Sequence, residues 1–168
     1  MGDSGTGYGI VIDISSVGKG LVAMNVDDDV DSNEWVERVK EYFITCVHTV
    51  LFARGVYPQF IFEQRRYLGI SIWFSRHPEV NEYIQKVIDN AHPMIMNNLI
   101  DRMVVAFDSK DNTPLDHIIV KCASLRRAFS NSEELSDGDR TILEEEFRST
   151  ILRLGMLDQQ MTRVPEDQ

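Results

Sequence analysis

Cysteine is scarce in this chain of 168 residues, which contains only Cys46 and Cys122. No CxxC or Cys/His spacing surrounds either one, so the sequence shows no zinc-site pattern. Each lies in a segment with the pattern of a core element, and we expect two reduced, buried thiols of an intracellular protein. No run of about 18 uncharged apolar residues exists, and residues 1–9 lack a secretory signal pattern. We therefore expect no membrane association.

A recognisable catalytic constellation is also lacking. No nucleophile–base–acid set is readable around the four histidines, which are His48, His77, His92 and His117. His48 lies beside an apolar helical stripe, where a structural histidine is expected, and Asp116 and His117 are strand neighbours that point to opposite faces. Residues 27–31 mimic the start of a calcium-binding loop, but Ser32 stands where that loop needs glycine. The sequence predicts no enzyme, no metal site and no cofactor.

Positive charge is in short supply, because 17 Lys and Arg face 27 Asp and Glu, for a net charge of −10. Residues 1–33 carry a net −5 and residues 128–168 a net −6, whereas residues 34–127 carry +1. Affinity for nucleic acid comes mostly from lysines and arginines that neutralise phosphates. We therefore expect no direct nucleic-acid binding, so that any role at DNA depends on a protein partner.

The strongest structural signal is a long amphipathic helix over about residues 33–54. Asp31 is expected to cap it, with Glu34 three residues later completing a capping box. Its apolar residues repeat at helical spacing and form one stripe, which should lie at the centre of the core. The stripe consists of Trp35, Val39, Tyr42, Phe43, Cys46, Val47, Val50 and Leu51.

The remaining pattern alternates hairpins with helices, which predicts an α+β domain of three helices packed on one antiparallel sheet. The expected elements are strands at Phe60–Phe62 and Leu68–Phe74 around a turn at Gln64–Arg66, a helix from Pro78 that Pro93 kinks or ends, a hairpin of Met103–Phe107 with Leu115–Cys122, and a helix over about 138–154.

The length suits one domain, with its core in residues 34–157 and a polar tail in 158–168. Residues 1–33 are expected to form an acidic extension. Within it, alternating patterns at 8–14 and 21–26 flank a Ser/Gly turn and predict a hairpin. We hypothesise that residues 8–26 cover an edge of the sheet, so that removing residues 2–30 would lower the thermal midpoint and promote aggregation.

Several motifs follow one another in the predicted core. They are CVHTVLFARGVYP (46–58), IFEQRR (61–66), HPEVNEYIQ (77–85), DRMVVAFD (101–108) followed by the return strand 115–122, and FRSTILRL (147–154). In this order the motifs resemble the HORMA-domain family. The most specific of them, HPEVNEYIQ, is similar to the branch that serves as accessory subunit of translesion DNA polymerase zeta.

The resemblance implies a HORMA-like fold and the role of a non-catalytic adaptor in translesion synthesis and DNA repair. Such adaptors hold a short, proline-containing partner peptide beneath a C-terminal "seat belt". The implied partners are the catalytic subunit of polymerase zeta, other HORMA-binding proteins, and a second HORMA domain in a homodimer or heterodimer. The implied location is the nucleus, with the cytoplasm as an alternative.

Two residues match functional positions of the family. Tyr83 matches a tyrosine that packs on the proline of the partner peptide, and a plain core aromatic is an equally weighted alternative. Arg148 matches an arginine of the interface through which such domains dimerise by their third helices. Its alternative is an exposed helix arginine paired with the neighbouring Glu144 and Glu145.

The sequence departs from the family pattern at its C-terminal end. Only eleven residues follow Leu157, whereas the family continues into the seat belt, so we expect an incomplete clasp and an exposed sheet edge that invites strand pairing. Two other functions stay open. One is a spindle-checkpoint or meiotic HORMA protein in cell-cycle control, and the other, of a different class, is a small enzyme.

Overall fold

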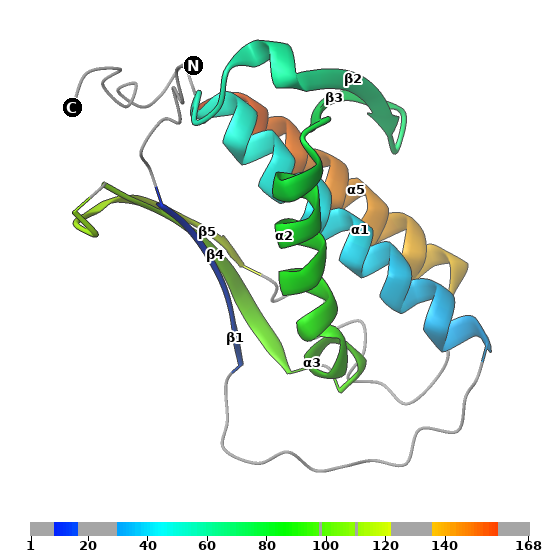
Figure 1. The fold of residues 1–168 in the computed structure, drawn as a ribbon. Coiled ribbons are helices and arrows are strands. Elements are labelled where there is room, and N and C mark those ends of the chain that lie inside the picture. The colour runs from blue at the N-terminus through cyan, green and yellow to red at the C-terminus, as the bar shows by residue number, and fades with distance from the viewer. Residues whose placement is uncertain (1–8, 17–29, 98, 110, 122–135, 158–168) are drawn as a thin grey trace.

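The computed structural model describes residues 9–16, 30–97, 99–109, 111–121 and 136–157 (Figure 1). Helices lie over one face of an antiparallel sheet, and a separate hairpin packs at the far side of the helices. In chain order the elements are β1 Gly9–Ser16, α1 Val30–Ala53, the 3₁₀ turn η1 Gln59–Ile61, β2 Phe62–Tyr67, β3 Ile70–Ser75, α2 Pro78–Asn90, α3 His92–Met96, β4 Ile100–Asp108, β5 Pro114–Lys121 and α5 Asp137–Gly155.

Helix α1 is the centre of the core. All eight residues of its predicted apolar stripe are buried, and Phe43, Cys46 and Val47 are completely enclosed. Cys46 is buried and forms no disulfide with a described residue, whereas Cys122 lies outside the described residues. The prediction that Asp31 caps this helix in a capping box was wrong, because the helix begins at Val30 and Asp31 therefore lies inside its first turn.

Helix α5 packs along α1 through aromatic rings. The ring of Phe147 stacks on Tyr42 with centroids 3.9 Å apart and lies 6.3 Å from the ring of Trp35. Ser136 caps the helix, because its hydroxyl accepts a hydrogen bond from the Asp139 N–H at 3.2 Å. The predicted third helix is confirmed to within one residue at each end.

The main sheet has the strand order β1–β4–β5, with both pairs antiparallel. Ile12 on β1 lies opposite Val105 on β4, and Val105 lies opposite Ile118 on β5. All three side chains are buried, and the helices lie over one face of this sheet (Figure 1). On the other face Leu115 and Ile119 remain exposed, so the strands alternate between core and surface as the period of two requires.

The second hairpin corrects two predictions. Residues 64–66, expected as a turn, lie inside β2. The turn falls at Leu68 and Gly69, which have φ angles of 46° and 79°, because a two-residue hairpin loop needs two left-handed residues and glycine adopts that conformation freely. Among the described residues β2 and β3 also form a sheet of their own, so the strands do not make one sheet.

The predicted N-terminal hairpin is described only in part. Its first strand is β1, which pairs along the whole of β4 with register partners from Gly9–Asp108 to Ser16–Ile100. The second expected strand, residues 21–26, lies outside the described residues. One edge of β4 is therefore covered by a segment more than eighty residues earlier in the chain, since even the nearest register partners, Ser16 and Ile100, are 84 residues apart.

We predict that β1 stabilises the domain through Ile12, which is 7% exposed. Replacing Ile12 by alanine removes buried methylene and methyl groups and should lower the free energy of unfolding by about 2–4 kcal/mol in urea titration. Ile142→Ala is the matched control, because Ile142 is 61% exposed and should change stability by about 0.5 kcal/mol or less. Equal effects of the two changes would show that β1 does not dock as described.

Candidate functional site

The candidate site is the outer edge of β5 together with the neighbouring end of α1 and the exposed face of α2. Among the described residues β5 pairs with β4 on one side and has no strand on its other side. An unpaired edge presents backbone N–H and C=O groups that an extended segment of another chain can pair with. The edge predicted to be exposed therefore lies at β5.

An ion pair ties β5 to the C-terminal end of α1. The Nη2 atom of Arg54 lies 2.8 Å from Oδ2 of Asp116, and the two side chains are 4% and 22% exposed. The other carboxylate oxygen, Oδ1, accepts a hydrogen bond from the backbone N–H of His117 at 2.8 Å. Both oxygens of Asp116 are therefore used, one by a buried guanidinium and one by the strand itself.

Tyr83 projects from α2, and its side chain is 42% exposed. The start of α2 is fixed by two residues of its first turn. Pro78 occupies the first helical position, and Asn81 donates from Nδ2 to the Ser75 carbonyl at 2.8 Å. Burial raises the pKa of Tyr57, just beyond α1, and the charge of Tyr83 raises it further. Tyr83 is thus a surface aromatic and not a core residue, while its binding role stays a prediction.

Arg148 lies on α5 and already has partners within the chain. Its Nε donates to the carbonyl of Leu68 at 3.0 Å, in the turn between β2 and β3, and its Nη1 pairs with Glu145. The predicted pairing with a neighbouring glutamate is therefore present, but Glu144 pairs instead with Arg38 on α1 at 3.0 Å. A dimer role for Arg148 stays a prediction.

The surface of α5 beside Arg148 carries three exposed apolar side chains. Ile142, Leu152 and Met156 are 61%, 46% and 48% exposed. Their spacing of ten and four residues places them along one side of the helix. The inward side, in contrast, holds Leu143, Phe147, Ile151 and Leu154, all of which are buried.

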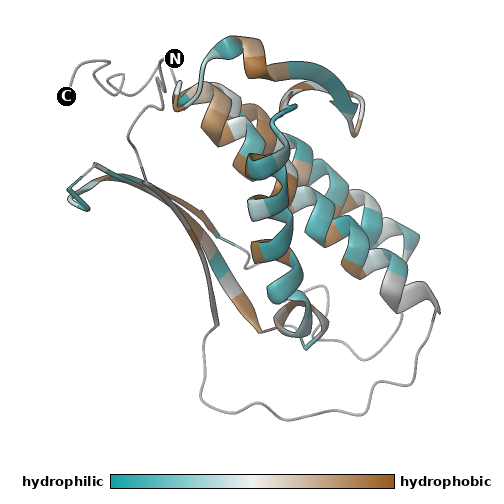
Figure 2. Cartoon of the chain, viewed as in Figure 1, coloured by the Kyte–Doolittle hydropathy of each residue, from teal (hydrophilic) through white to brown (hydrophobic). Residues whose placement is uncertain are grey.

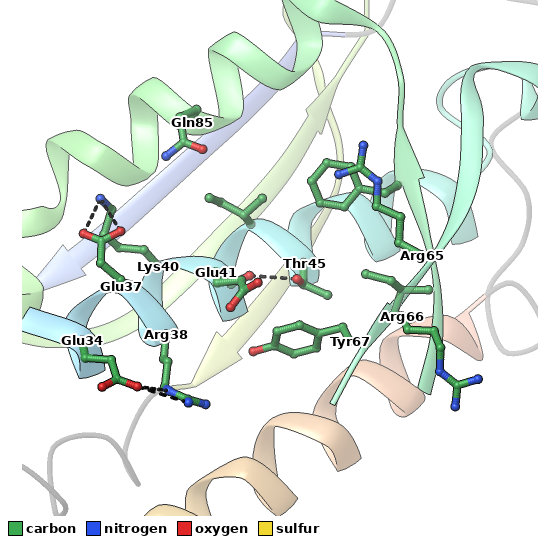
Figure 3. A pocket seen from close by; sticks show the side chains of 13 residues that line it. Glu34, Glu37, Arg38, Lys40, Glu41, Thr45, Arg65, Arg66, Tyr67 and Gln85 are labelled. Atoms are coloured by element: carbon green, nitrogen blue, oxygen red, sulfur yellow. Dashed lines mark hydrogen bonds and ion pairs between the residues drawn. The ribbon is translucent and has the colours of Figure 1, made fainter. Parts of the chain in front are cut away.

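A cavity of about 650 Å³ opens between α1, α2 and the β2–β3 hairpin (Figure 3). Most of its charges are already paired: Arg38 binds Glu34 at 3.3 Å, and Arg65 binds Glu63 at 2.7 Å while stacking on the ring of Phe74. We therefore assign it no ligand. The lining comprises Glu34, Glu37, Arg38, Lys40, Glu41, Ile44, Thr45, Arg65, Arg66, Tyr67, Ile72, Phe74 and Gln85.

At the margin of this cavity a nearly buried lysine joins α1 to α2. Lys40 Nζ lies 2.8 Å from Asp89 Oδ1 and 3.1 Å from Glu37 Oε1. Burial alone would lower the pKa of Lys40, but its hydrogen bonds to Asp89 and Glu37 outweigh that effect and raise it. The hydrogen bond from Lys40 holds the pKa of Asp89 below its usual value. The pair fixes the position of α2, and with it Tyr83.

His48 is the structural histidine that the sequence predicted. It is 1% exposed, its ring stacks on Phe74 with centroids 3.6 Å apart, and its Nδ1 accepts the backbone N–H of Ser75 at 3.2 Å. Burial, reinforced by the positive charge of Arg65, lowers its pKa to about 3. The ring is therefore neutral at pH 7 and joins α1 to β3.

The described residues hold no cluster of three or more His, Cys, Asp or Glu side chains placed to bind a metal ion. Within those same residues no helix has the length and hydrophobicity needed to cross a membrane. The residues that sequence reasoning missed are Arg54 and Asp116. Their pairing joins positions 62 residues apart, and only their location at the ends of a helix and a strand hinted at it.

Comparison with known proteins gives consistent likenesses. No protein-family model matches the chain. A DNA polymerase zeta processivity subunit of Arabidopsis thaliana is 32% identical over 108 residues, which are 61% of this chain and 50% of that protein. The mitotic spindle assembly checkpoint protein MAD2B of Rattus norvegicus is 28% identical over 120 residues, 71% of this chain and 55% of that protein. The chain thus spans about half the length of the curated relatives it matches.

A solved structure described as the crystal structure of the mitotic checkpoint complex has a TM-score of 0.64 to this chain at 21% identity. The match covers 78% of this chain and 68% of that one. The predicted fold class, α+β, and the resemblance that the motifs carried are both confirmed by these likenesses.

We predict that His48 makes the domain lose stability in mild acid. Its folded pKa of about 3 lies below the unfolded value of about 6.5, so the unfolded chain binds the proton first as pH falls. The free energy of unfolding should drop by about 2 kcal/mol between pH 7 and pH 5 from this group alone. His48→Asn keeps an acceptor for the Ser75 N–H but does not titrate, and its loss over this interval should be smaller by that amount. Identical pH dependence, measured by urea unfolding, would contradict the assignment.

Proposed function

We propose that this chain, a HORMA-domain relative of the polymerase zeta processivity subunits and of MAD2B, is a non-catalytic adaptor that binds a short peptide of a partner protein. Its proposed partner is the catalytic subunit of polymerase zeta, held through a proline-containing segment. The proposed setting is translesion DNA synthesis and DNA repair in the nucleus.

The observation that carries the proposal is that the described residues leave one edge of β5 without a strand partner and leave Tyr83 exposed on α2. The end of α1 is tied to β5, because Arg54 binds Asp116, and the charge of Tyr83 on α2 raises the pKa of Tyr57, three residues beyond Arg54, which burial has already raised. An extended peptide would gain main-chain hydrogen bonds from β5. A proline of that peptide would gain a flat apolar platform from the tyrosine ring.

The charge of the chain favours a protein partner over nucleic acid. Its net charge is −10, and both flanks are acidic. Phosphate neutralisation needs clustered lysines and arginines, and among the described residues Arg38, Arg54 and Arg65 are bound to carboxylates. A role at DNA through a bound polymerase subunit is consistent with this balance.

We further propose that two HORMA domains associate through α5. Arg148 supplies a half-exposed guanidinium, and the apolar side chains of Ile142, Leu152 and Met156 flank it on a surface that no described element covers. Burial of such side chains on association is favourable by roughly 25 cal/mol per Å² of apolar area. The partner is a second copy of this chain or another HORMA domain.

A second candidate function is cell-cycle control, as a spindle-checkpoint or meiotic HORMA protein. The names of the MAD2B relatives and the likeness to a mitotic checkpoint complex support it. The two functions share one binding chemistry and differ in the peptide bound. Titration with a peptide from the polymerase catalytic subunit, in competition with a checkpoint peptide, separates them by affinity.

We predict that Tyr83→Ala weakens binding of a proline-containing peptide from the polymerase zeta catalytic subunit. Loss of the apolar platform should cost about 2–4 kcal/mol, or roughly thirtyfold or more in Kd, in calorimetric titration. Tyr83→Phe keeps the ring and should remain within about threefold of the parent chain. An Ala variant that binds as tightly as the parent would remove Tyr83 from the site.

For the dimer we predict that Arg148→Ala and Leu152→Arg each weaken self-association by about tenfold or more, measured by sedimentation equilibrium. Lys86→Ala, at an exposed position on α2, is the control and should leave the association constant unchanged within a factor of about two. Thermal midpoints check that losing the Arg148–Leu68 hydrogen bond leaves the fold intact. A monomeric parent chain, or variants that associate normally, would reject this interface.

A further inference from the structure

The carboxylate of Asp116 lies on the free edge of β5. Its Oδ1 accepts the N–H of His117 at 2.8 Å, while its Oδ2 is held by Arg54 at 2.8 Å. Strands in a ladder are only about 4.8 Å apart, which leaves no room for a carboxylate between them. His117 pairs with Ala106 within the regular part of the β4–β5 register. Its N–H must therefore point away from β4, toward the unpaired side.

The direction of this one N–H fixes the directions of its neighbours. In an antiparallel ladder the N–H and C=O of one residue point to the same side, and the side alternates at each residue. The N–H groups of Ile119 and Lys121 therefore also face the free edge, whereas those of Ile118 and Val120 face β4. Pro114, at the start of the strand, has no N–H to offer.

We propose that Asp116, held by Arg54, is a positioning residue that sets where a docked peptide strand ends on β5. The proposal rests on the function proposed above, in which a peptide pairs with this edge. Since no strand among the described residues pairs with this edge, Ile119 and Lys121 offer N–H donors to an incoming strand, but the donor of His117 is already bound. Pairing that extended past Ile119 would have to displace a carboxylate that a buried guanidinium holds in place.

The geometry of the ion pair makes it suited to this task. Arg54 is 4% exposed and lies at the end of the helix that forms the centre of the core, so it moves little. A charged group placed against a strand edge is a common means of limiting edge pairing. Here the Asp116 carboxylate blocks only the His117 position and leaves the rest of the β5 edge open. This selects the register in which a peptide strand can pair with β5.

Amide hydrogen exchange, read residue by residue by NMR, tests the proposal with a synthetic proline-containing peptide from the polymerase zeta catalytic subunit. On peptide binding, exchange at Ile119 and Lys121 should slow by about tenfold or more, the effect of one added hydrogen bond, while His117 stays unchanged. A His117 amide that gains the same protection in the parent chain would overturn the inference and leave the proposed function standing. If no amide of β5 gains protection, both fail.

Two variants test whether the Asp116 carboxylate, and not another feature of β5, prevents pairing at His117. In the double variant Arg54→Leu with Asp116→Leu both members of the ion pair become apolar, a change that folded proteins tolerate far better than loss of one member. The His117 amide should then gain about tenfold protection on peptide binding, like its neighbours. Asp116→Asn keeps an oxygen for the His117 N–H, and it should retain the pattern of the parent chain. A double variant whose His117 amide still gains nothing would show that Asp116 does not set the end of pairing.

Discussion

The burial of one face of α1 is the constraint on which the rest of this structure depends. The helix meets α5 through the Phe147–Tyr42 stack, β3 through the His48–Ser75 hydrogen bond, and α2 through Lys40 and Asp89. Its last turn reaches β5 through Arg54. Because α2, α3, α5, β3 and β4 all contact this helix, its buried stripe sets where the sheet edges and the exposed side chains lie.

The sheet treats its two edges differently. On one side β1 pairs along the whole length of β4 and removes that edge from solvent. On the other side β5 has no partner strand among the described residues. One of its backbone donors, the N–H of His117, is nevertheless hydrogen-bonded to the Asp116 carboxylate. A protein that keeps one edge for a partner must limit unwanted pairing there. In the arrangement proposed above, the Arg54–Asp116 pair would limit pairing without closing the edge.

The acidity of this chain is compatible with the proposed adaptor function. Its surplus of carboxylates disfavours contact with phosphate, and several of the described basic residues, among them Arg38, Arg54 and Arg65, are engaged in ion pairs within the domain. What remains available is main-chain hydrogen bonding, an exposed tyrosine and an apolar helix surface. These are features that recognise another polypeptide, consistent with relatives named as polymerase and checkpoint components.

Periodicity in the sequence was enough to determine the helices, the Met103–Phe107 hairpin and the fold class, because each depends on local spacing of apolar residues. The motifs also determined the family resemblance. Tertiary structure alone decided the rest. The β2–β3 turn moved to Leu68 and Gly69, where positive φ angles are required, and β1 was assigned to β4. The contact between Arg54 and Asp116 arises only when α1 and β5 are packed together, and no pattern of nearby residues encodes such a distance.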